Sequence, residues 1–248
     1  MSQSTFILVH AAWLGAWAWH DVAQILVEQG HSVVVPDLPG HGGDNTPAGD
    51  IHLKDYVDRI MLEVDRSDGP VVLVGHSFAG IVISQVAEIA GPEKVKGLVY
   101  VAAFLLPDGG SFIDAVSGVT DSVAVEHFYL SGDETTAHVA EEKMHEAFAQ
   151  DVPQEAFIAA SQFFVPEPAA PLMEKLSLTG ENYRVVPRYY IEATEDKAVP
   201  ITAQRAMASA GNVRRTFSLN TGHCPNFSQP GKLAEYLQEI HGELNPAR

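Results

Sequence analysis

Hydrophobic positions along the chain fall into short continuous runs with longer amphipathic stretches between them. Continuous runs rich in Val, Ile and Leu are typical of parallel strands that helices cover on both faces. The runs of this kind are residues 6–9, 32–35, 71–74 and 98–101, and further strand signals lie at residues 188–193 and 213–219. Helical patterns occupy residues 18–29, 53–64, 81–90 and 231–240, and glycine or proline breakers follow the first three. Strands that alternate with helices predict an α/β fold with a doubly wound, mostly parallel sheet.

The alternation stops between residues 104 and 184. This segment is rich in helical patterns, carries acidic side chains such as Glu141 and Glu142, and ends in a proline-containing stretch. A helical segment inserted between two parts of one sheet is interpreted as a lid. We therefore expect residues 1–103 and 185–248 to form the α/β core, with residues 104–184 as an inserted helical lid.

Composition and charge exclude several classes of protein. The formal net charge of −17 repels phosphate backbones and anionic lipid, so neither nucleic acid nor a membrane is expected as a partner. The single cysteine, Cys224, excludes an intrachain disulfide. The chain shows no signal-peptide pattern and no apolar run of about 18 residues, and a cytoplasmic location is the resulting expectation. No clustered metal-ligand pattern or phosphate-binding loop is found, and no cofactor and no metal are expected.

Ser77 is the candidate nucleophile. It follows the run at 71–74 and precedes a helical pattern, within Gly75-His76-Ser77-Phe78-Ala79-Gly80. A strand–turn–helix corner of this kind lifts a serine hydroxyl out of the sheet. The usual spacing has a glycine two residues after the serine, whereas this chain has Ala79 there and Gly80 next.

A nucleophilic serine needs a base and an acid that orients the base. His223 lies in the loop after the run at 213–219, and the carboxyl ends of parallel strands are where catalytic groups gather. His241 is expected in a solvated tail after the last helix. Asp196 is the first choice for the acid because it lies just past the run at 188–193, and Glu195 and Glu192 remain alternatives.

The oxyanion hole requires two N–H donors. One is expected from Phe78, the residue after the nucleophile, and the other from Ala12 in the loop after the first strand. His10 is expected to brace this loop by hydrogen bonding. His41, in Asp37-Leu38-Pro39-Gly40-His41-Gly42, is interpreted as part of a structural turn.

Four segments together carry a family resemblance: residues 6–19, Gly75–Gly80, Thr194-Glu195-Asp196-Lys197 and Gly222-His223. They resemble the plant methylesterase and hydroxynitrile lyase branch of the α/β-hydrolases and its bacterial esterase relatives. The resemblance implies the α/β-hydrolase fold, a Ser77–His223–Asp196 triad and oxyanion donors at Ala12 and Phe78.

Two positions separate the activities within that branch. The lyases carry Thr directly after the loop histidine and Lys directly after the catalytic histidine, whereas this chain has Ala11 and Cys224. The resemblance therefore favours a carboxylesterase. A hydroxynitrile lyase, a lactonase or carbon–carbon hydrolase, and a non-catalytic ligand-binding receptor are the alternatives.

The expected partner is a small neutral hydrophobic ester, because the lid is acidic and aromatic and no arginine occurs between Arg66 and Arg184. A homodimer is left open. The side chains expected to line the substrate pocket are Ala11, Trp13, Phe104, Phe128, Phe163 and Phe164.

Overall fold

A six-stranded parallel sheet forms the centre of the computed structural model, which describes residues 3–246. Its spatial order is β2-β1-β3-β4-β8-β9, and every neighbouring pair is parallel. The strands are β1 (Thr5–Val9), β2 (Ser32–Val34), β3 (Val71–His76), β4 (Val95–Val101), β8 (Arg188–Ala193) and β9 (Arg215–Leu219). All lie where the hydrophobic runs predicted them, with ends that differ by up to three residues. The α/β fold with a parallel sheet is confirmed.

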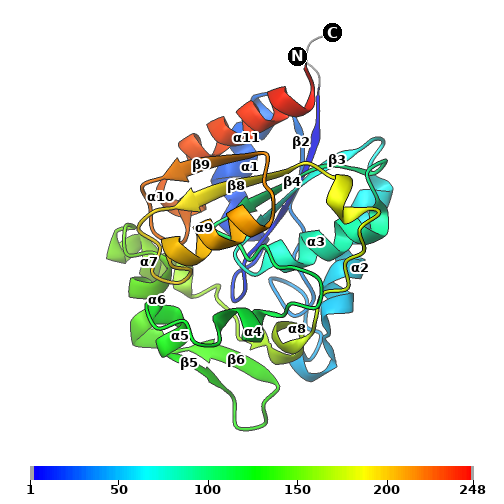
Figure 1. The fold of residues 1–248 in the computed structure, drawn as a ribbon. Helices are drawn as coiled ribbons and strands as arrows, with labels where there is room; N and C mark the ends of the chain where they lie inside the picture. Colours follow the sequence, from blue (N-terminus) through cyan, green and yellow to red (C-terminus); the bar gives the residue numbers. More distant parts are fainter. Residues whose placement is uncertain (1–2, 247–248) are drawn as a thin grey trace.

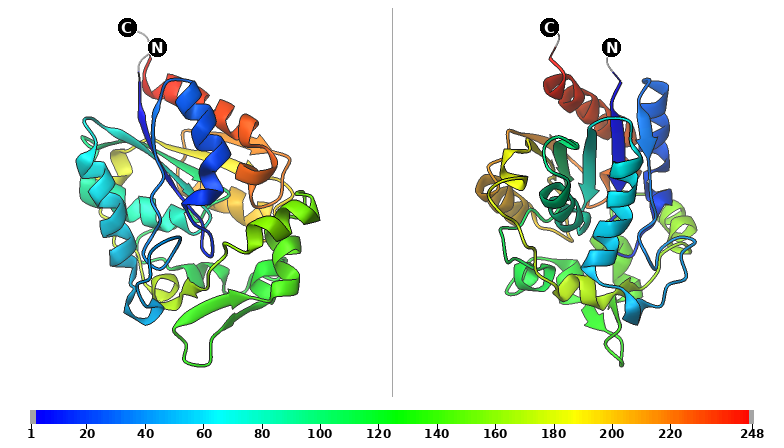
Figure 2. Two further views of the ribbon diagram at one scale, coloured as in Figure 1. Left: turned by 180° about the vertical axis from the view of Figure 1, so that it is seen from behind. Right: turned by 90° about the vertical axis from the view of Figure 1, so that its right-hand side faces the viewer.

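Helices cover both faces of this sheet (Figures 1 and 2). The longer ones are α1 (His20–Glu28), α2 (Leu53–Arg66), α3 (Ala79–Ala90), α9 (Ile201–Ala210) and α11 (Pro230–Leu244). The short ones in the core are η1 (Ala16–Trp19), η2 (Ala48–Asp50) and α10 (Pro225–Ser228). The pair α1 and α11 packs together on one face, and α2, α3 and α9 lie on the other.

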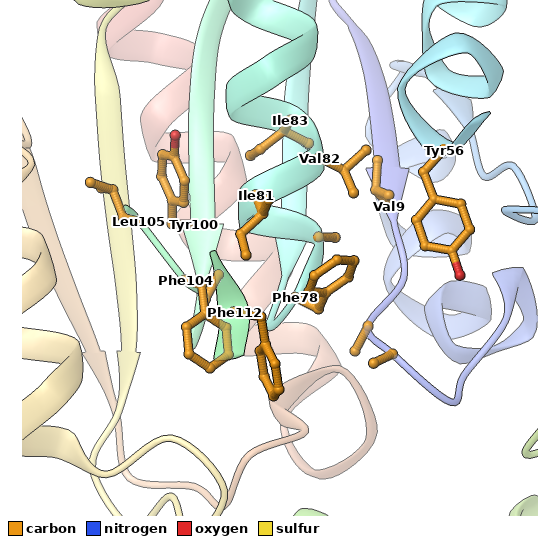
Figure 3. Packing of buried hydrophobic residues seen from close by; sticks show 14 of the residues in the cluster. Val9, Tyr56, Phe78, Ile81, Val82, Ile83, Tyr100, Phe104, Leu105 and Phe112 are labelled. Carbon is orange, nitrogen blue, oxygen red and sulfur yellow. The ribbon is translucent and has the colours of Figure 1, made fainter. Parts of the chain in front are cut away.

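Alternate residues of each strand supply the two cores. Phe6 and Leu8 of β1 pack with residues of α1 and α11, whereas Ile7 and Val9 pack with residues of α2 and α3. Figure 3 shows part of this second cluster around α3, with Tyr56 of α2 beside it. Because both faces of the central strands are buried, residues 6–9, 71–74 and 98–101 are apolar at every position, which explains the continuous hydrophobic runs there.

Most of the segment between β4 and β8 gathers at one end of the sheet, and its last part returns beside α3 (Figure 1). It contains α4 (Phe112–Val116), α5 (Val123–Glu126), α6 (Glu141–Phe148), α7 (Gln154–Ser161), α8 (Ala169–Met173) and η3 (Tyr183–Val185). It also contains a small antiparallel sheet of β5 (Phe128–Leu130), β6 (Thr136–Val139) and β7 (Glu167–Pro168). The inserted segment thus contains helices, as expected, together with a small sheet that the sequence did not indicate. These strands are too short to show an alternating pattern, and the pairing of β6 with β7 joins residues far apart in the chain.

The last helix, α11, extends further than the sequence pattern indicated and ends at Leu244. His241 lies inside α11 and is buried, with its Nδ1 2.9 Å from Ser4 Oγ. The expectation of a solvated tail is wrong because α11 continues to Leu244. No helix within residues 3–246 is long and apolar enough to cross a membrane.

Candidate active site

Ser77 occupies the sharp corner between β3 and α3. Its φ of 55° lies in the left-handed region, which is costly for a residue with a side chain. Three backbone hydrogen bonds hold it there: Ser77 N donates to Val101 O, and Ser77 O accepts from the N–H groups of Gly80 and Phe104. This geometry places Ser77 beyond the carboxyl end of β3, where it lines a cavity together with His223.

Close packing at this corner depends on two glycines. A Cβ on Gly75 would lie 2.8 Å from Ala79 O, and a Cβ on Gly80 would lie 2.4 Å from Phe104 O. Both distances are far below a van der Waals contact, so neither position has room for a side chain. Ala79 is fully buried without such a conflict. The glycine needed for the close crossing is therefore Gly80, and the departure from the usual motif at Ala79 is accommodated.

His223 and Asp196 meet across the ends of β9 and β8. His223 Nδ1 lies 2.7 Å from Asp196 Oδ2, and the two side chains are 2% and 0% exposed. Because the carboxylate accepts, Nδ1 carries the hydrogen and Nε2 remains the basic nitrogen. Asp196 is also held by Ala198 N at 2.7 Å and Val199 N at 2.8 Å. Glu192, one of the alternatives, instead binds Arg205.

Two buried side chains that the sequence analysis did not identify support this pair. Gln204 of α9 donates from Nε2 to Asp196 Oδ2 at 3.0 Å, and its amide also exchanges hydrogen bonds with the Ala193 backbone. The His76 ring lies 4.8 Å from the His223 ring, and its Nε2 donates to His223 O at 2.8 Å. Burial, followed by repulsion from His223, holds the pKa of His76 well below its usual value, so this ring stays neutral. Nothing in the sequence around Gln204 indicates a role at the site. His76 could have been suspected, because it directly precedes Ser77.

Two backbone N–H groups near Ser77 have no partner. Within residues 3–246, neither Ala12 N nor Phe78 N donates a hydrogen bond to another protein group, although both residues are buried. Buried N–H groups without a partner are rare and call for an explanation. Both belong to residues from which the sequence predicted oxyanion donors, and Ala12 lines a pocket that also reaches Ser77.

The loop of residues 10–13, here named the oxyanion loop, is braced by His10 as expected. His10 Nδ1 donates to Ala11 O at 2.9 Å, and Nε2 accepts from Leu38 N at 3.1 Å. Burial, helped by the charge of His41, lowers the pKa of His10 to about 3. Because Ala11 O and Ala12 N–H belong to one planar peptide group, a bond to the first also orients the second.

An apolar cavity of about 420 Å³ opens beside Ser77 and His223. Trp13, Phe104 and Phe128 line it, and the ring of Phe112 packs between Phe104 and Phe78 (Figure 3). Among the described residues that line it, Asp114 is the one carboxylate and there is no lysine or arginine.

A narrow second pocket also reaches Ser77 and His223. Ala11, Ala12, Phe164 and Cys224 are among the residues that line it. Phe163 lies outside both pockets: it is 55% exposed, and its ring packs against Trp17. The expectation that Phe163 lines the pocket is therefore corrected. Adjacent residues of an irregular segment point in different directions, and the sequence does not show which one faces inward.

Over the described range, 3–246, no group of three or more His, Cys, Asp or Glu side chains is arranged to hold a metal ion.

Comparisons with known proteins agree on the family. The model of the alpha/beta hydrolase family matches residues 6–236. Methylesterase 7 of Arabidopsis thaliana is 32% identical over 252 residues, with 96% of each chain covered. The alpha-hydroxynitrile lyase of the same plant is 30% identical over 253 residues, covering 95% of this chain and 96% of its own. The chain spans 55–71% of the length of five chloroplastic relatives from Arabidopsis.

A solved structure gives the same result for the fold. The pyrethroid hydrolase from Sphingobium faniae JZ-2 superposes with a TM-score of 0.87 at 27% identity, covering 96% of this chain and 97% of its own. The relatives thus include enzymes named for ester hydrolysis and one named for cyanohydrin cleavage.

Proposed function

The chain belongs to the alpha/beta hydrolase family, and from this premise we propose that it is a serine carboxylesterase using Ser77, His223 and Asp196. Its similarity to a methylesterase and to a pyrethroid hydrolase supports an esterase-type hydrolase. The observation that carries the proposal is the arrangement at one cavity wall. A serine in a strained corner and a histidine whose Nδ1 is bonded to a buried carboxylate line the same cavity.

The proposed reaction is a two-step acyl transfer. His223 Nε2 takes the proton of Ser77 as its oxygen attacks the ester carbonyl, and the protonated imidazole then gives that proton to the leaving alcohol. Water, activated by His223 in the same way, hydrolyses the acyl-enzyme and restores Ser77. Asp196 keeps the hydrogen on Nδ1 and stabilises the imidazolium.

The N–H groups of Ala12 and Phe78 are proposed to bind the oxygen that becomes negative. Their lack of another partner supports this role, because a donor already committed to a protein acceptor is poorly placed to serve a substrate. Each such donor contributes roughly 10²–10³ in rate at related sites. The fixed backbone at Ser77 and in the oxyanion loop means that little reorganisation is needed during the reaction.

The cavity supports neutral, hydrophobic esters as the substrate class. Its lining is mainly aromatic and aliphatic, and the one carboxylate in its described lining, Asp114, lies 3.9 Å from Lys175 and offers an anionic substrate no attraction. An anionic ester would lose hydration there without gaining a cationic partner. The larger cavity suits an apolar acyl or alcohol group, whereas the narrow pocket beside Ala11 and Cys224, with a volume of about 10 Å³, holds little more than a water molecule.

Ester hydrolysis is favoured over cyanohydrin cleavage. The buried thiol of Cys224 stands where the resembling lyases carry an ammonium group, and the described linings of both pockets contain no lysine. A leaving cyanide would therefore lack a cation.

A series of p-nitrophenyl esters tests the proposal on the wild type and Ser77→Ala. We expect turnover by the wild type that rises with acyl length and is lost in the variant. A matched pair, p-nitrophenyl valerate and a succinate half ester, tests the charge preference, and the neutral ester should react faster. Activity retained in Ser77→Ala would contradict the nucleophile, and equal rates for the matched pair would contradict the substrate class.

A further inference from the structure

A buried carboxylate from the lid binds the oxyanion loop. Glu167 of β7 is fully buried and accepts three hydrogen bonds: from Trp13 N at 2.9 Å, His41 Nε2 at 2.9 Å and Tyr56 OH at 2.8 Å. Trp13 and His41 share Oε2, and Tyr56 binds Oε1. A carboxylate removed from water is costly unless partners such as these replace its hydration. The residue is therefore tied to three elements of the core.

His41 is a cation in this cluster. Its Nδ1 lies 3.0 Å from Pro39 O and its Nε2 lies 2.9 Å from the Glu167 carboxylate. Both partners only accept, so both ring nitrogens must carry a hydrogen. Burial opposes the charge, but attraction and hydrogen bonding to Glu167, with help from Pro39 O and Asp37, outweigh it and raise the pKa of His41. The neighbouring His10 ring, 4.8 Å away, is neutral.

The lid holds every polar group of Trp13. Its N–H donates to Glu167, its carbonyl accepts from Val165 N at 3.0 Å, and its Nε1 donates to Ala137 O at 2.8 Å. Ala137 and Glu167 are paired residues of β6 and β7, so one small sheet supplies two of these contacts. Trp13 has a φ of 62°, a strained conformation for a non-glycine residue that persists only where the surrounding contacts enforce it.

These contacts bear directly on the proposed oxyanion donor. Trp13 N belongs to the peptide group that follows Ala12, and Ala12 N belongs to the one that His10 holds through Ala11 O. The Ala11–Ala12 peptide is thus held by His10 of the core, and the Ala12–Trp13 peptide is held by Glu167 of the lid. Release of either plane would let the Ala12 N–H turn away from the substrate oxygen.

We propose that Glu167 is a positioning residue for the oxyanion loop, and that its ion pair with His41 is required for full turnover. The inference rests on the proposed function, since turnover is its main readout. Glu167 is not among the described residues that line either pocket at Ser77, and it acts through Trp13. The lid sheet thereby has a role in completing the site, beyond covering it.

The test compares Glu167→Gln with a matched control, Glu174→Gln. Glu174 is a partly exposed lid carboxylate that accepts from a backbone N–H, Leu53 N at 2.8 Å, and from a histidine, His52 Nδ1 at 2.6 Å. Both of these partners belong to α2 and its cap, away from the oxyanion loop. Glu167→Gln should lose roughly 10- to 100-fold in kcat with KM little changed, because the displaced donor acts in the transition state. Glu174→Gln should keep kcat within about two-fold of the wild type, as expected for a contact remote from the transition state.

A milder variant keeps the test valid if Glu167→Gln does not fold. Tyr56→Phe retains the ring that packs on Phe78 and removes one donor to Glu167, and a loss of a few-fold in kcat is expected. The Ala12 and Trp13 amide signals in a ¹⁵N–¹H spectrum give a readout without substrate, and they should shift in Tyr56→Phe.

The outcomes separate the two proposals. Unchanged kcat and unchanged loop amides in the folded variants would overturn the role of Glu167 while leaving the esterase proposal intact. A wild type without Ser77-dependent turnover would refute the esterase proposal, and the amide shifts would then decide the positioning role alone.

Discussion

Acidification should destabilise the fold through His10. This ring is buried and neutral, with Nδ1 donating to Ala11 O and Nε2 accepting from Leu38 N. A proton on Nε2 would point at the Leu38 N–H, so that two donors would face each other. It would also add a positive charge next to His41. For these reasons the pKa of His10 falls from its ordinary 6.5 to about 3 in the folded chain.

The sign and size of the effect follow from proton linkage. Because the pKa of His10 is lower in the folded state than in the unfolded state, its contribution to stability is present above pH 6.5 and is lost as pH falls towards 3. Each pH unit within that window costs about 1.36 kcal/mol per proton. Between pH 7.5 and pH 4.5 the loss is therefore about 2.7 kcal/mol, a large part of the 5–15 kcal/mol that stabilises a typical domain.

Other groups titrate in the same range, and a variant isolates His10. The lowered pKa of His76 acts in the same direction, whereas His41, whose pKa is raised, loses its contribution as pH rises. The variant His10→Asn offers a donor and an acceptor but does not titrate, so the other groups cancel in the comparison.

Urea unfolding of both proteins at the two pH values measures the difference. The stability of the wild type relative to His10→Asn should fall by about 2.7 kcal/mol on acidification. The same pH dependence in both proteins would refute the reasoning, because His10 would then bind its proton equally well in the folded state.

Three further outcomes are expected. Gln204→Met should lower the free energy of unfolding by roughly 2–6 kcal/mol, because several buried hydrogen bonds lose a partner. It should also lower kcat, and a variant as stable and active as the wild type would contradict the role given to this amide. Gly80→Ala should cost at least about 1–3 kcal/mol of stability because its Cβ would meet Phe104 O, whereas Ala79→Gly should cost only about 1 kcal/mol; thermal unfolding ranks the two. Burial, reinforced by nearby carboxylates, raises the pKa of the Cys224 thiol, so Ellman's reagent should react with it only after unfolding; rapid reaction of the native protein would be the contrary result.

Much of the fold could be predicted because its signals are local. A parallel strand buried on both faces is apolar at every position, and the amphipathic helices between the strands end at glycine and proline. The order of Ser77 before Asp196 and His223, each just past a strand, likewise follows from the chain itself. In a parallel sheet, residues just past the carboxyl ends of the strands share one edge, which is why sequence position alone brought these three residues together.

The choice among similar residues required the tertiary structure. Asp196, rather than Glu192 or Glu195, approaches His223, and this depends on how the chain turns after β8. Phe163 points away from the pockets although its neighbour Phe164 lines one of them. A shift of one residue in an irregular segment reverses the direction of a side chain without changing the hydrophobic pattern.

The supporting residues of the site were decided by contacts between distant parts of the chain. Glu167 lies 126 positions from His41 and 154 from Trp13, and nothing in its own segment distinguishes it from the solvated acids of the lid. Gln204 is likewise one polar residue of an amphipathic helix until α9 packs against Asp196. The sequence by itself determined the strands and main helices of the core and the candidates Ser77 and His223, because periodicity and chain order carry that information. Which polar groups are buried together, and hence which of them hold the site in shape, was decided only when the lid and the core met.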